Sequence, residues 1–503
     1  MVQDSPDRLV VAFDDERVVA NAGILLPVTL GEQLGIEALV DEIVDLGERP
    51  GAARPGRKVL SLAHAMLLGA DSIDDCDVLR AGRTEAVLGH QAMAPSTLGT
   101  FLRSFTFGHV RQLDQILATA LARAWSAGAG PGEERLVIDI DSFVGEVHGH
   151  AKQGAGYGYT GQLGYHPLMA SRSDTAEVLH VRQRKGQANT QRGALRFVQE
   201  LIPRVRRAGA SGEILLRGDS GFWNKKVCAY LKKQGCRFSI GVNMHPAVQA
   251  LIAQIPDQDW QPVEGYPDTG VCELAETTLG DERLIVRRVH LHAQDAQGEL
   301  FTYWRHHAFI TNRAEPMHLV DAEHRQHAVV ELVIRDLKDQ ALAHFPSGHF
   351  AANSAWTVIA CLAHNLSRWT TCSDSATRHP ERRPPFAGDH SPRPDGSPAP
   401  HDDQRFTCPP AGLGRSTSPK RSPASERSPR PPDPPRPDTP DHTPPATLSR
   451  GQNTCLLSTS ARPTPPSRAL PRPIPINDGL GWPWALQNRR QAAQSLHKRW
   501  IQA

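Results

Sequence analysis

The chain has 503 residues and a formal net charge of +2. This length exceeds the roughly 100 to 200 residues of a usual single domain, so two or more domains are expected. Eight cysteines without a C-x-x-C pair argue against a zinc knuckle or a disulfide framework. The sequence shows no apolar run of roughly 18 residues and no charged-then-apolar leader, which predicts a soluble, cytoplasmic protein with no membrane partner.

The small net charge hides an uneven distribution. Residues 1–370 contain 37 Lys+Arg and 43 Asp+Glu, whereas residues 371–503 contain 19 and 11, together with 27 of the 41 prolines. Bulk charge therefore gives no argument for a polyanionic partner, although local basic clusters could still neutralise phosphates. Each cluster could equally be a solvated helix face. The clusters are residues 182–185, Arg204, Arg206 with Arg207, Lys225 with Lys226, and Lys232 with Lys233.

The pattern of apolar residues divides the chain into five parts. Residues 1–130 are predicted to be mainly helical after a short strand (RLVVAF), with Ser96 or Thr97 capping the helix that follows. Residues 131–241 alternate strands and helices, which is typical of an α/β region with a buried sheet. Residues 242–312 are predicted to be a β-rich insertion, and residues 313–370 to be two helices. Residues 371–503 are rich in Pro, Arg and Ser, a composition typical of disorder.

Aspartates are predicted to lie at the ends of two strands. Asp139 and Asp141 lie two positions apart in the strand RLVIDID, so their side chains point to the same side. Asp219 ends a second strand, EILLRGD, that could lie beside the first. Although G-D-S-G also surrounds the nucleophile of trypsin-like proteases, the alternating strands and helices do not indicate their β-barrel fold.

A third acid is predicted from a helix of residues 324–338. At about 100° per residue, its polar residues form one stripe and its apolar residues face the other way. The stripe contains His324, His327, Glu331, Arg335 and Lys338. Two strand-end aspartates and a helical glutamate, if brought together, make the all-oxygen site that Mg²⁺ or Mn²⁺ prefers. A solvated helix face is the alternative interpretation.

Long segments of the chain resemble bacterial insertion-sequence transposases of the DDE class, of the branch with a Y-(2)-R-(3)-E-(6)-K signature. The resemblance extends from about residue 10 to residue 370. It is carried by AGILL, LLGADSIDDCDVLR, APSTLGTFLRSFTFGHVRQLD, DIDSFVGEVHGHAKQGAGYGYTGQLGYHPLMA, RGDSGFWN and HRQHAVVELVIRDLK. It implies an RNase H-like α/β catalytic core with a β-rich insertion and a helical N-terminal region that binds DNA.

The resemblance also implies roles for single residues. Asp141, Asp219 and Glu331 are expected to be the catalytic acids and the ligands of Mg²⁺ or Mn²⁺, with Asp139 supporting the strand. Lys338 occupies the signature lysine position, and a DNA contact is expected from it. His324 and His327 replace the signature tyrosine and arginine, and their DNA contacts are expected to be weaker at neutral pH unless Arg325 or Arg335 compensates. The implied partners are double-stranded DNA, at the element ends and the target, and a second copy of the chain in a synaptic complex.

The proline-rich tail departs from the family pattern and suggests a decayed or frame-altered C-terminus. An active transposase is one interpretation of the whole chain. A non-catalytic or domesticated DNA-binding derivative is another, and a metal-dependent nuclease of the same fold is a third. The sequence leaves all three open.

Overall fold

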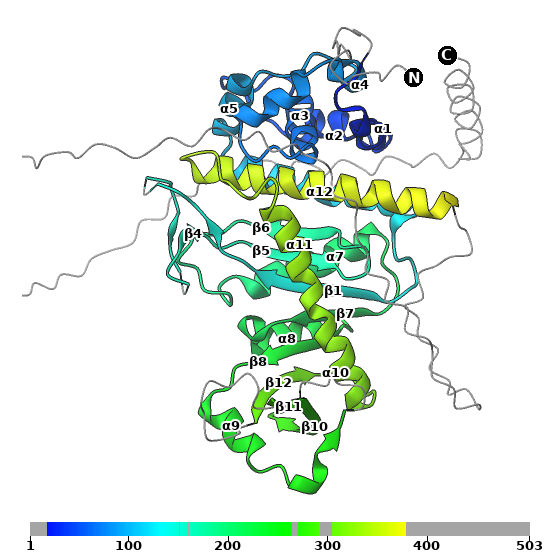
Figure 1. Cartoon of the computed structure of the whole chain (residues 1–503), viewed down its shortest axis with the longest axis vertical. Helices are drawn as coiled ribbons and strands as arrows, with labels where there is room; N and C mark the ends of the chain where they lie inside the picture. Colours follow the sequence, from blue (N-terminus) through cyan, green and yellow to red (C-terminus); the bar gives the residue numbers. More distant parts are fainter. Residues whose placement is uncertain (1–17, 150, 159, 264–269, 292–303, 379–503) are drawn as a thin grey trace, which may run out of the picture. The chain divides into compact units, whose positions relative to one another are not determined.

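The computed structural model describes residues 18–149, 151–158, 160–263, 270–291 and 304–378 (Figure 1). The chain divides into two compact units, residues 1–394 and 395–503, and all described residues belong to the first. The predicted strand RLVVAF and the tail beyond residue 378 lie outside the described residues.

Helices dominate the N-terminal part of the described chain, as predicted. They are η2 (Ala22–Ile24), α1 (Leu25–Gln33), α2 (Ile36–Ile43), α3 (Pro55–Leu67), η3 (Asp74–Arg80), α4 (Thr84–Leu88), α5 (Pro95–Arg103), α6 (Phe107–Ala124) and the π-helical turn η4 (Trp125–Ala129). The predicted cap of α5 by Ser96 or Thr97 is wrong. Pro95 is the first helical residue, and the cap position falls on Ala94; proline suits this first position because its φ is already helical and it lacks the N–H that the helix would leave unpaired.

A nine-stranded mixed sheet forms the centre of the protein, in the order β6-β5-β1-β7-β8-β12-β11-β10-β9. Its strands are β1 (Leu136–Ser142), β5 (Leu168–Arg172), β6 (Val178–Arg182), β7 (Ile214–Gly218), β8 (Arg237–Val242), β9 (Gln261–Pro262), β10 (Gly270–Leu279), β11 (Glu282–Leu291) and β12 (Arg305–Thr311). A small second sheet contains β2 (Gly145–Glu146), β3 (Gly156–Tyr157) and β4 (Leu163–Tyr165).

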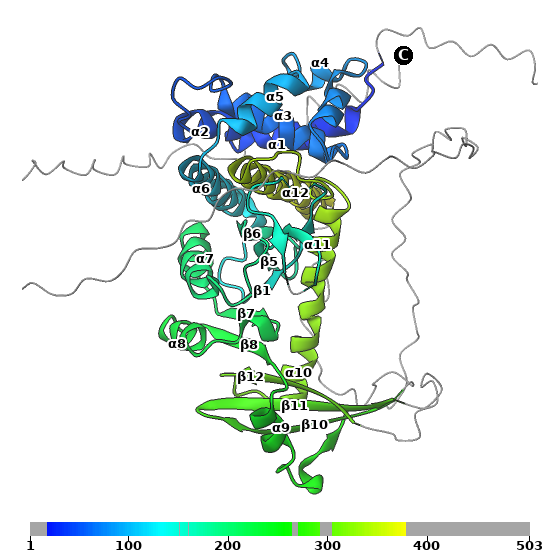
Figure 2. The same cartoon turned by 90° about the vertical axis from the view of Figure 1, so that its left-hand side faces the viewer.

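The strand β1 divides the core of this sheet into two halves. On one side β5 and β6 continue antiparallel, and on the other side β7 and β8 run parallel to β1. Helices α7 (Ala194–Ala208) and α8 (Lys225–Lys233) lie on one face, and α11 (Val329–Lys338) lies on the other (Figure 2). Three antiparallel strands followed by two parallel ones fit the RNase H-like core expected of a DDE domain.

The insertion between β8 and the C-terminal helices is β-rich, as predicted, and it extends the main sheet rather than forming a separate one. After the short helices α9 (Pro246–Ile252) and η6 (Asp257–Asp259), β12 returns to pair with β8. A small core cluster joins these strands to α10 (Met317–Arg325). Its members are Leu274, Ile285, Phe309, Met317 and Val320.

The long helix α12 (Phe350–Arg378) lies between the N-terminal helices and the free edge of β6 (Figures 1 and 2). The Asn365 side chain accepts from Val178 N at 2.7 Å and donates to Val178 O at 2.8 Å, so it satisfies the edge strand in place of another strand. Buried Glu177 accepts from the indole N–H groups of Trp125 and Trp369. This helix continues eight residues past the predicted boundary at residue 370.

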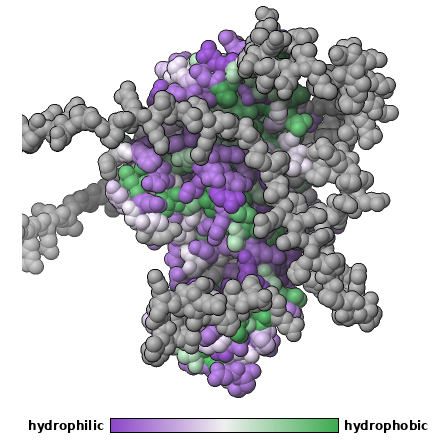
Figure 3. Space-filling model, in the orientation of Figure 1, coloured by the Kyte–Doolittle hydropathy of each residue, from purple (hydrophilic) through white to green (hydrophobic). Residues whose placement is uncertain are grey.

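The described surface carries a few large exposed hydrophobic side chains, among them Val18, Leu25 and Leu26 near the start of α1. On the face in Figure 3, hydrophobic residues form separate patches among hydrophilic ones. No single helix in the described part of the chain is long and apolar enough to cross a bilayer. A bent pair, Ala22–Gln33 with Ile36–Ile43, meets that criterion by length and composition only.

Candidate active site

Asp141 and Asp219 lie side by side at the carboxyl ends of two neighbouring parallel strands. The register of β1 and β7 pairs Ile140 with Gly218, so the next residue of each strand is one of the two aspartates. Backbone N–H groups orient both carboxylates: Ser142 donates to Asp141 Oδ1 at 2.6 Å, and Gly221 donates to Asp219 Oδ1 at 3.1 Å. The sheet thus brings together the two aspartates that the sequence predicted.

Glu331 approaches this pair from another element. It lies in the first turn of α11, which contacts β1, and its side chain is exposed. The pKa of Asp141 is raised to about 6, mainly by burial and in smaller part by the negative charges of Asp219 and Glu331, while the Ser142 N–H and His327 oppose the rise. Glu331 is therefore near enough for its negative charge to act on Asp141.

In the described part of the chain, no Lys or Arg forms an ion pair with Asp141, Asp219 or Glu331. Partial burial raises the pKa of Asp219 as well, although its side chain is still exposed at the strand end. Carboxylates that repel one another and lack a cationic partner are stabilised by a bound divalent ion. The donor set is all oxygen and partly open to solvent, which fits Mg²⁺ or Mn²⁺.

Asp139 points to the same side of β1 and has a different role. Its side chain is 0% exposed, and Arg217 holds both of its oxygens at 2.7 Å. Arg217 also donates to the Glu323 carbonyl in α10 at 2.5 Å, and His327 Nδ1 lies 3.0 Å from Asp139 Oδ1. This buried pair therefore ties the helices that carry Glu331 to the strands that carry the aspartates.

The predicted continuous helix of residues 324–338 is interrupted. A 3₁₀ turn, η8 (Gln326–Ala328), separates α10 from α11. Three residues at about 120° instead of 100° rotate the two helices by roughly 60° relative to one another. Only Glu331, Arg335 and Lys338 of the predicted stripe are exposed. Leu332, one of the apolar residues expected on the opposite side, is 47% exposed.

The two histidines of the predicted stripe, which were expected to contact DNA, face inward in the structure. His324 donates to or accepts from Ser239 Oγ at 2.8 Å and stacks on Phe309 with ring centroids 4.1 Å apart. Burial lowers the pKa of His324 to about 3, so it is uncharged at neutral pH. His327 is 16% exposed and is engaged with Asp139. Neither ring is placed as a cationic phosphate contact.

The other three predicted DNA contacts differ in whether their side chains already pair with an acid. Arg325 pairs with buried Asp321 at 3.0 Å. Arg335 is 63% exposed and has only a 3.8 Å approach to its neighbour Asp336. Lys338 is exposed on the same face of α11 as Glu331. Arg335 and Lys338 are therefore the predicted cations that remain available to a ligand beside Glu331.

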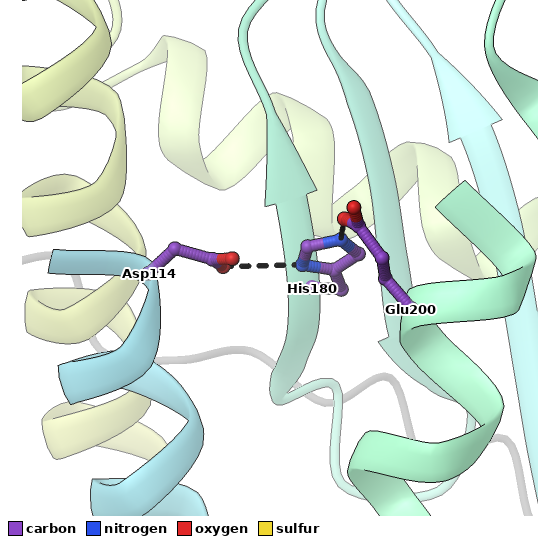
Figure 4. Close-up of side chains that lie close together, drawn as sticks. All are labelled: Asp114, His180 and Glu200. Atoms are coloured by element: carbon purple, nitrogen blue, oxygen red, sulfur yellow. Dashed lines mark hydrogen bonds and ion pairs between the residues drawn. The ribbon is translucent and has the colours of Figure 1, made fainter. Parts of the chain in front are cut away.

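A second group of acids and a histidine was not predicted from the sequence. Asp114 on α6, His180 on β6 and Glu200 on α7 converge so that their ligand atoms lie within 4.8 Å of one another (Figure 4). His180 Nδ1 and Nε2 lie 3.2 Å from oxygens of Asp114 and Glu200, respectively. These residues come from positions 114, 180 and 200, a spacing that carries no recognisable motif.

Arginines surround this second group. Arg204 approaches Asp114 at 2.7 Å, and Arg111 approaches Asp114 at 3.1 Å and Glu200 at 3.3 Å; Glu200 also pairs with Arg182 and Arg196. Burial opposes ionisation of Asp114, but His180 and Arg204 hold its pKa below the usual range. Arginine stays protonated in proteins, so these cations would repel a metal ion. The group is a buried ion cluster, and Arg204 belongs to it rather than to a solvated basic face.

Comparisons with known proteins identify the family of the chain. The profile of the family described as transposase DDE domain group 1 matches residues 2–382. Among solved structures, a piggyBac transposase synaptic complex with hairpin DNA is similar, with a TM-score of 0.41 and 14% identity, over 70% of this chain and 76% of that one. No curated protein matches the sequence. The family match covers most of the chain, and the chain therefore belongs to the transposases with a DDE domain of group 1.

Proposed function

We propose that this transposase is encoded by a bacterial insertion sequence, binds the terminal inverted repeats of that element, and cleaves and joins DNA through Asp141, Asp219 and Glu331. The observation that supports this assignment most directly is the placement of Asp141 and Asp219 on neighbouring parallel strands, with α11, which carries Glu331, in contact with β1. Among the described residues, no Lys or Arg forms an ion pair with any of these three carboxylates, whereas Asp114 and Glu200 pair with several arginines. The site has the charge that a divalent metal would compensate.

The proposed chemistry divides between the metal and the chain. Bound Mg²⁺ or Mn²⁺ would activate a water or a 3′-hydroxyl and stabilise the leaving oxygen of the phosphodiester. Asp141, Asp219 and Glu331 would hold the metal, and the Ser142 and Gly221 N–H groups keep the two aspartates oriented. The Asp139–Arg217 pair keeps α10 and α11, and with them Glu331, against the sheet.

DNA is proposed to lie along the exposed face of α11. Arg335 and Lys338 follow Glu331 by four and seven residues, so the three side chains share one face of the helix. A phosphate backbone on this face would meet both cations while the scissile phosphate faces the acids. Such contacts hold the backbone in register and carry no sequence information. Recognition of the inverted repeats is assigned to the N-terminal helices, and two copies of the chain are proposed to pair the two ends in the bacterial cytoplasm.

A cleavage assay with purified full-length protein tests the proposal. The substrate is duplex DNA that carries one end of the element with its native flank, in the presence of Mg²⁺ or Mn²⁺. Wild-type protein should nick the end and join it to a target duplex. Asp141→Asn, Asp219→Asn and Glu331→Gln should each lose both steps while they still retard the DNA in a gel.

A matched control is Asp339→Asn, because Asp339 is an exposed acid directly after α11. It should cleave like the wild type. Cleavage without joining would instead indicate a nuclease of the same fold. End binding without cleavage by the wild type would indicate a non-catalytic DNA-binding derivative. Full activity of any of the three acid variants would remove that residue from the mechanism.

A further inference from the structure

The loop between β6 and α7 contacts both turns that carry the catalytic aspartates. Thr190 in this loop places Oγ1 3.1 Å from Ser142 Oγ. Its methyl carbon and Cβ lie 2.7 Å and 2.9 Å from the point where a side chain on Gly221 would begin. Ser142 directly follows Asp141, and Gly221 lies two residues after Asp219. One threonine therefore touches the two turns at once, with its hydroxyl on one and its methyl on the other.

Both turn residues that Thr190 contacts also orient an acid. The Ser142 N–H donates to Asp141, and the Gly221 N–H donates to Asp219. A shift of either turn would move a carboxylate oxygen with it. Because the negative charge of Asp219 raises the pKa of Asp141, the two acids repel each other when both are ionised. A contact between their turns resists that separation.

The direction of the hydrogen bonds around Ser142 follows from its neighbours. His166 Nδ1 lies 2.5 Å from the Ala188 carbonyl, which can only accept, so Nδ1 carries the proton. The ring is buried and uncharged, because burial lowers the pKa of His166. Its Nε2, 3.1 Å from Ser142 Oγ, must then accept the single hydroxyl proton of Ser142. Ser142 Oγ has no proton left for Thr190, so Thr190 donates to Ser142.

The protein holds Thr190 in place through Arg184. The Arg184 guanidinium donates to the carbonyls of Asn189, Thr190 and Arg192 in this loop, at 2.8, 3.2 and 2.8 Å, and to the His166 carbonyl at 2.7 Å. Gln191 Nε2 adds a bond to the Trp223 carbonyl at 3.2 Å. The loop is thus fixed at both sides of Thr190 by groups that do not belong to the acid site.

We propose that Thr190 is a positioning residue that keeps Asp141 and Asp219 at the separation at which they bind a divalent metal, with Ser142 and His166 setting the direction of its hydrogen bond. This inference rests on the proposed metal site of the transposase. Residues that orient metal ligands typically change metal affinity by roughly 10- to 100-fold when they are replaced. The hydroxyl of Thr190 should act at the lower end of that range, because its bond is neutral.

Mn²⁺ binding to the full-length protein tests this role, with free Mn²⁺ measured by electron paramagnetic resonance. Thr190→Val removes the hydroxyl and keeps the methyl, and it should weaken Mn²⁺ binding by about 10-fold. Thr190→Ser keeps the donor and should bind Mn²⁺ more tightly than Thr190→Val. The melting temperature without metal and the affinity for DNA in EDTA should stay at the wild-type level in both. Thr119→Val is the matched control, because the Thr119 hydroxyl bonds only a carbonyl of its own helix.

A double variant tests whether Thr190 and Ser142 affect Mn²⁺ binding through the same hydrogen bond or independently. Ser142→Ala removes the acceptor, so it should weaken Mn²⁺ binding by a factor similar to that of Thr190→Val. The double variant should be no weaker than either single variant, because one interaction is lost only once. Multiplied effects, or wild-type Mn²⁺ binding by Thr190→Val, would overturn the role of Thr190. Asp219→Asn separates an error about Thr190 from an error about the metal site. If Asp219→Asn binds Mn²⁺ as tightly as the wild type, the proposed metal site itself is wrong.

Discussion

The two acid clusters of this protein contain the same kinds of residue in opposite electrostatic settings. Asp141, Asp219 and Glu331 have no Lys or Arg ion pair within the described residues, and the pKa of Asp141 is raised to about 6. Asp114 and Glu200 are approached by four arginines and His180, and the pKa of each is held below its usual range although burial opposes this. The number of paired arginines therefore distinguishes the proposed metal site from the buried ion cluster.

The largest expected difference between the clusters is in catalysis. Glu331→Gln should reduce DNA cleavage by at least about 10³-fold, because a lost metal ligand removes several kcal/mol of transition-state stabilisation. Glu200→Gln, a matched change in the arginine-rich cluster, should cleave within about tenfold of the wild type under conditions where it is folded. Single-turnover cleavage of an end substrate measures both. Equal losses in the two variants would contradict the separation of roles.

The free energy of unfolding should depend more on the arginine-rich cluster than on the acid site. Arg204→Met leaves Asp114 buried with one strong partner fewer, and it should lower the free energy of unfolding by about 3 kcal/mol. Asp219→Asn removes a repelling charge and should leave the free energy of unfolding unchanged or raise it. Urea unfolding at pH 7 without metal measures the two variants. A large loss of stability in Asp219→Asn would mean that this acid has a structural partner.

The pH dependence of stability offers a subtler comparison. The folded-state pKa of Asp141 is about 6, above the unfolded value of about 3.9, so the folded protein binds this proton more tightly. Its stabilising contribution is complete below about pH 4 and is lost as the pH rises through about 6. Without metal, the wild type should therefore lose at most about 3 kcal/mol relative to Asp141→Asn over this interval.

Thermal unfolding at pH 4 and pH 7, with EDTA or with Mn²⁺, measures this difference. Mn²⁺ should restore the stability of the wild type at pH 7 and leave Asp141→Asn unaffected. Asp339→Asn, outside the acid site, should follow the wild-type curve at both pH values. Parallel curves for the wild type and Asp141→Asn would show that folding does not raise the pKa of Asp141.

The smallest expected effect is a change in the salt dependence of DNA binding when an exposed cation is replaced. Lys338 is exposed without an ion pair among the described residues, whereas Arg196 pairs with Glu200 at 3.2 Å although it is 78% exposed. Lys338→Gln should reduce the salt dependence of DNA binding by about one unit of log–log slope, and Arg196→Gln should not. Gel retardation over a range of salt concentrations measures the slopes. An equal change in both would show that α11 does not carry the phosphate contacts.

Strong local patterns made much of the fold predictable. The strands around Asp141 and Asp219 are short apolar runs bounded by turn residues, and the structure has them as β1 and β7. The apolar residues of α7 recur at the spacing of a helix. The β-rich insertion lies at the position in the chain where it was predicted. The position of the insertion in the sheet was not predictable, because pairing of β12 with β8 joins residues about 70 positions apart.

The helix that carries Glu331 shows where local reasoning fails. A uniform 100° per residue placed His324 and His327 on the exposed stripe of Glu331. The 3₁₀ turn at residues 326–328 changes that phase, and contacts with Asp139, Ser239 and Phe309 pull both rings inward. A three-residue change of helix type leaves no signal in hydrophobic periodicity, so only the packed structure reveals it.

The sequence by itself determined the strands that end near Asp141 and Asp219 and the mainly helical and β-rich parts of the chain, because apolar periodicity and turn residues are local properties. The choice of Glu331 as the third acid came from the family resemblance. Only the tertiary structure decided which charged residues are free to act. Arg217 and Arg204 look like ordinary basic residues in the sequence, yet each is buried beside an aspartate from a distant segment. The same holds for Thr190, whose place between the two aspartate turns depends on a loop fixed by Arg184. Charge pairing acts through space over a few ångströms, and the order of residues along the chain does not encode that distance directly.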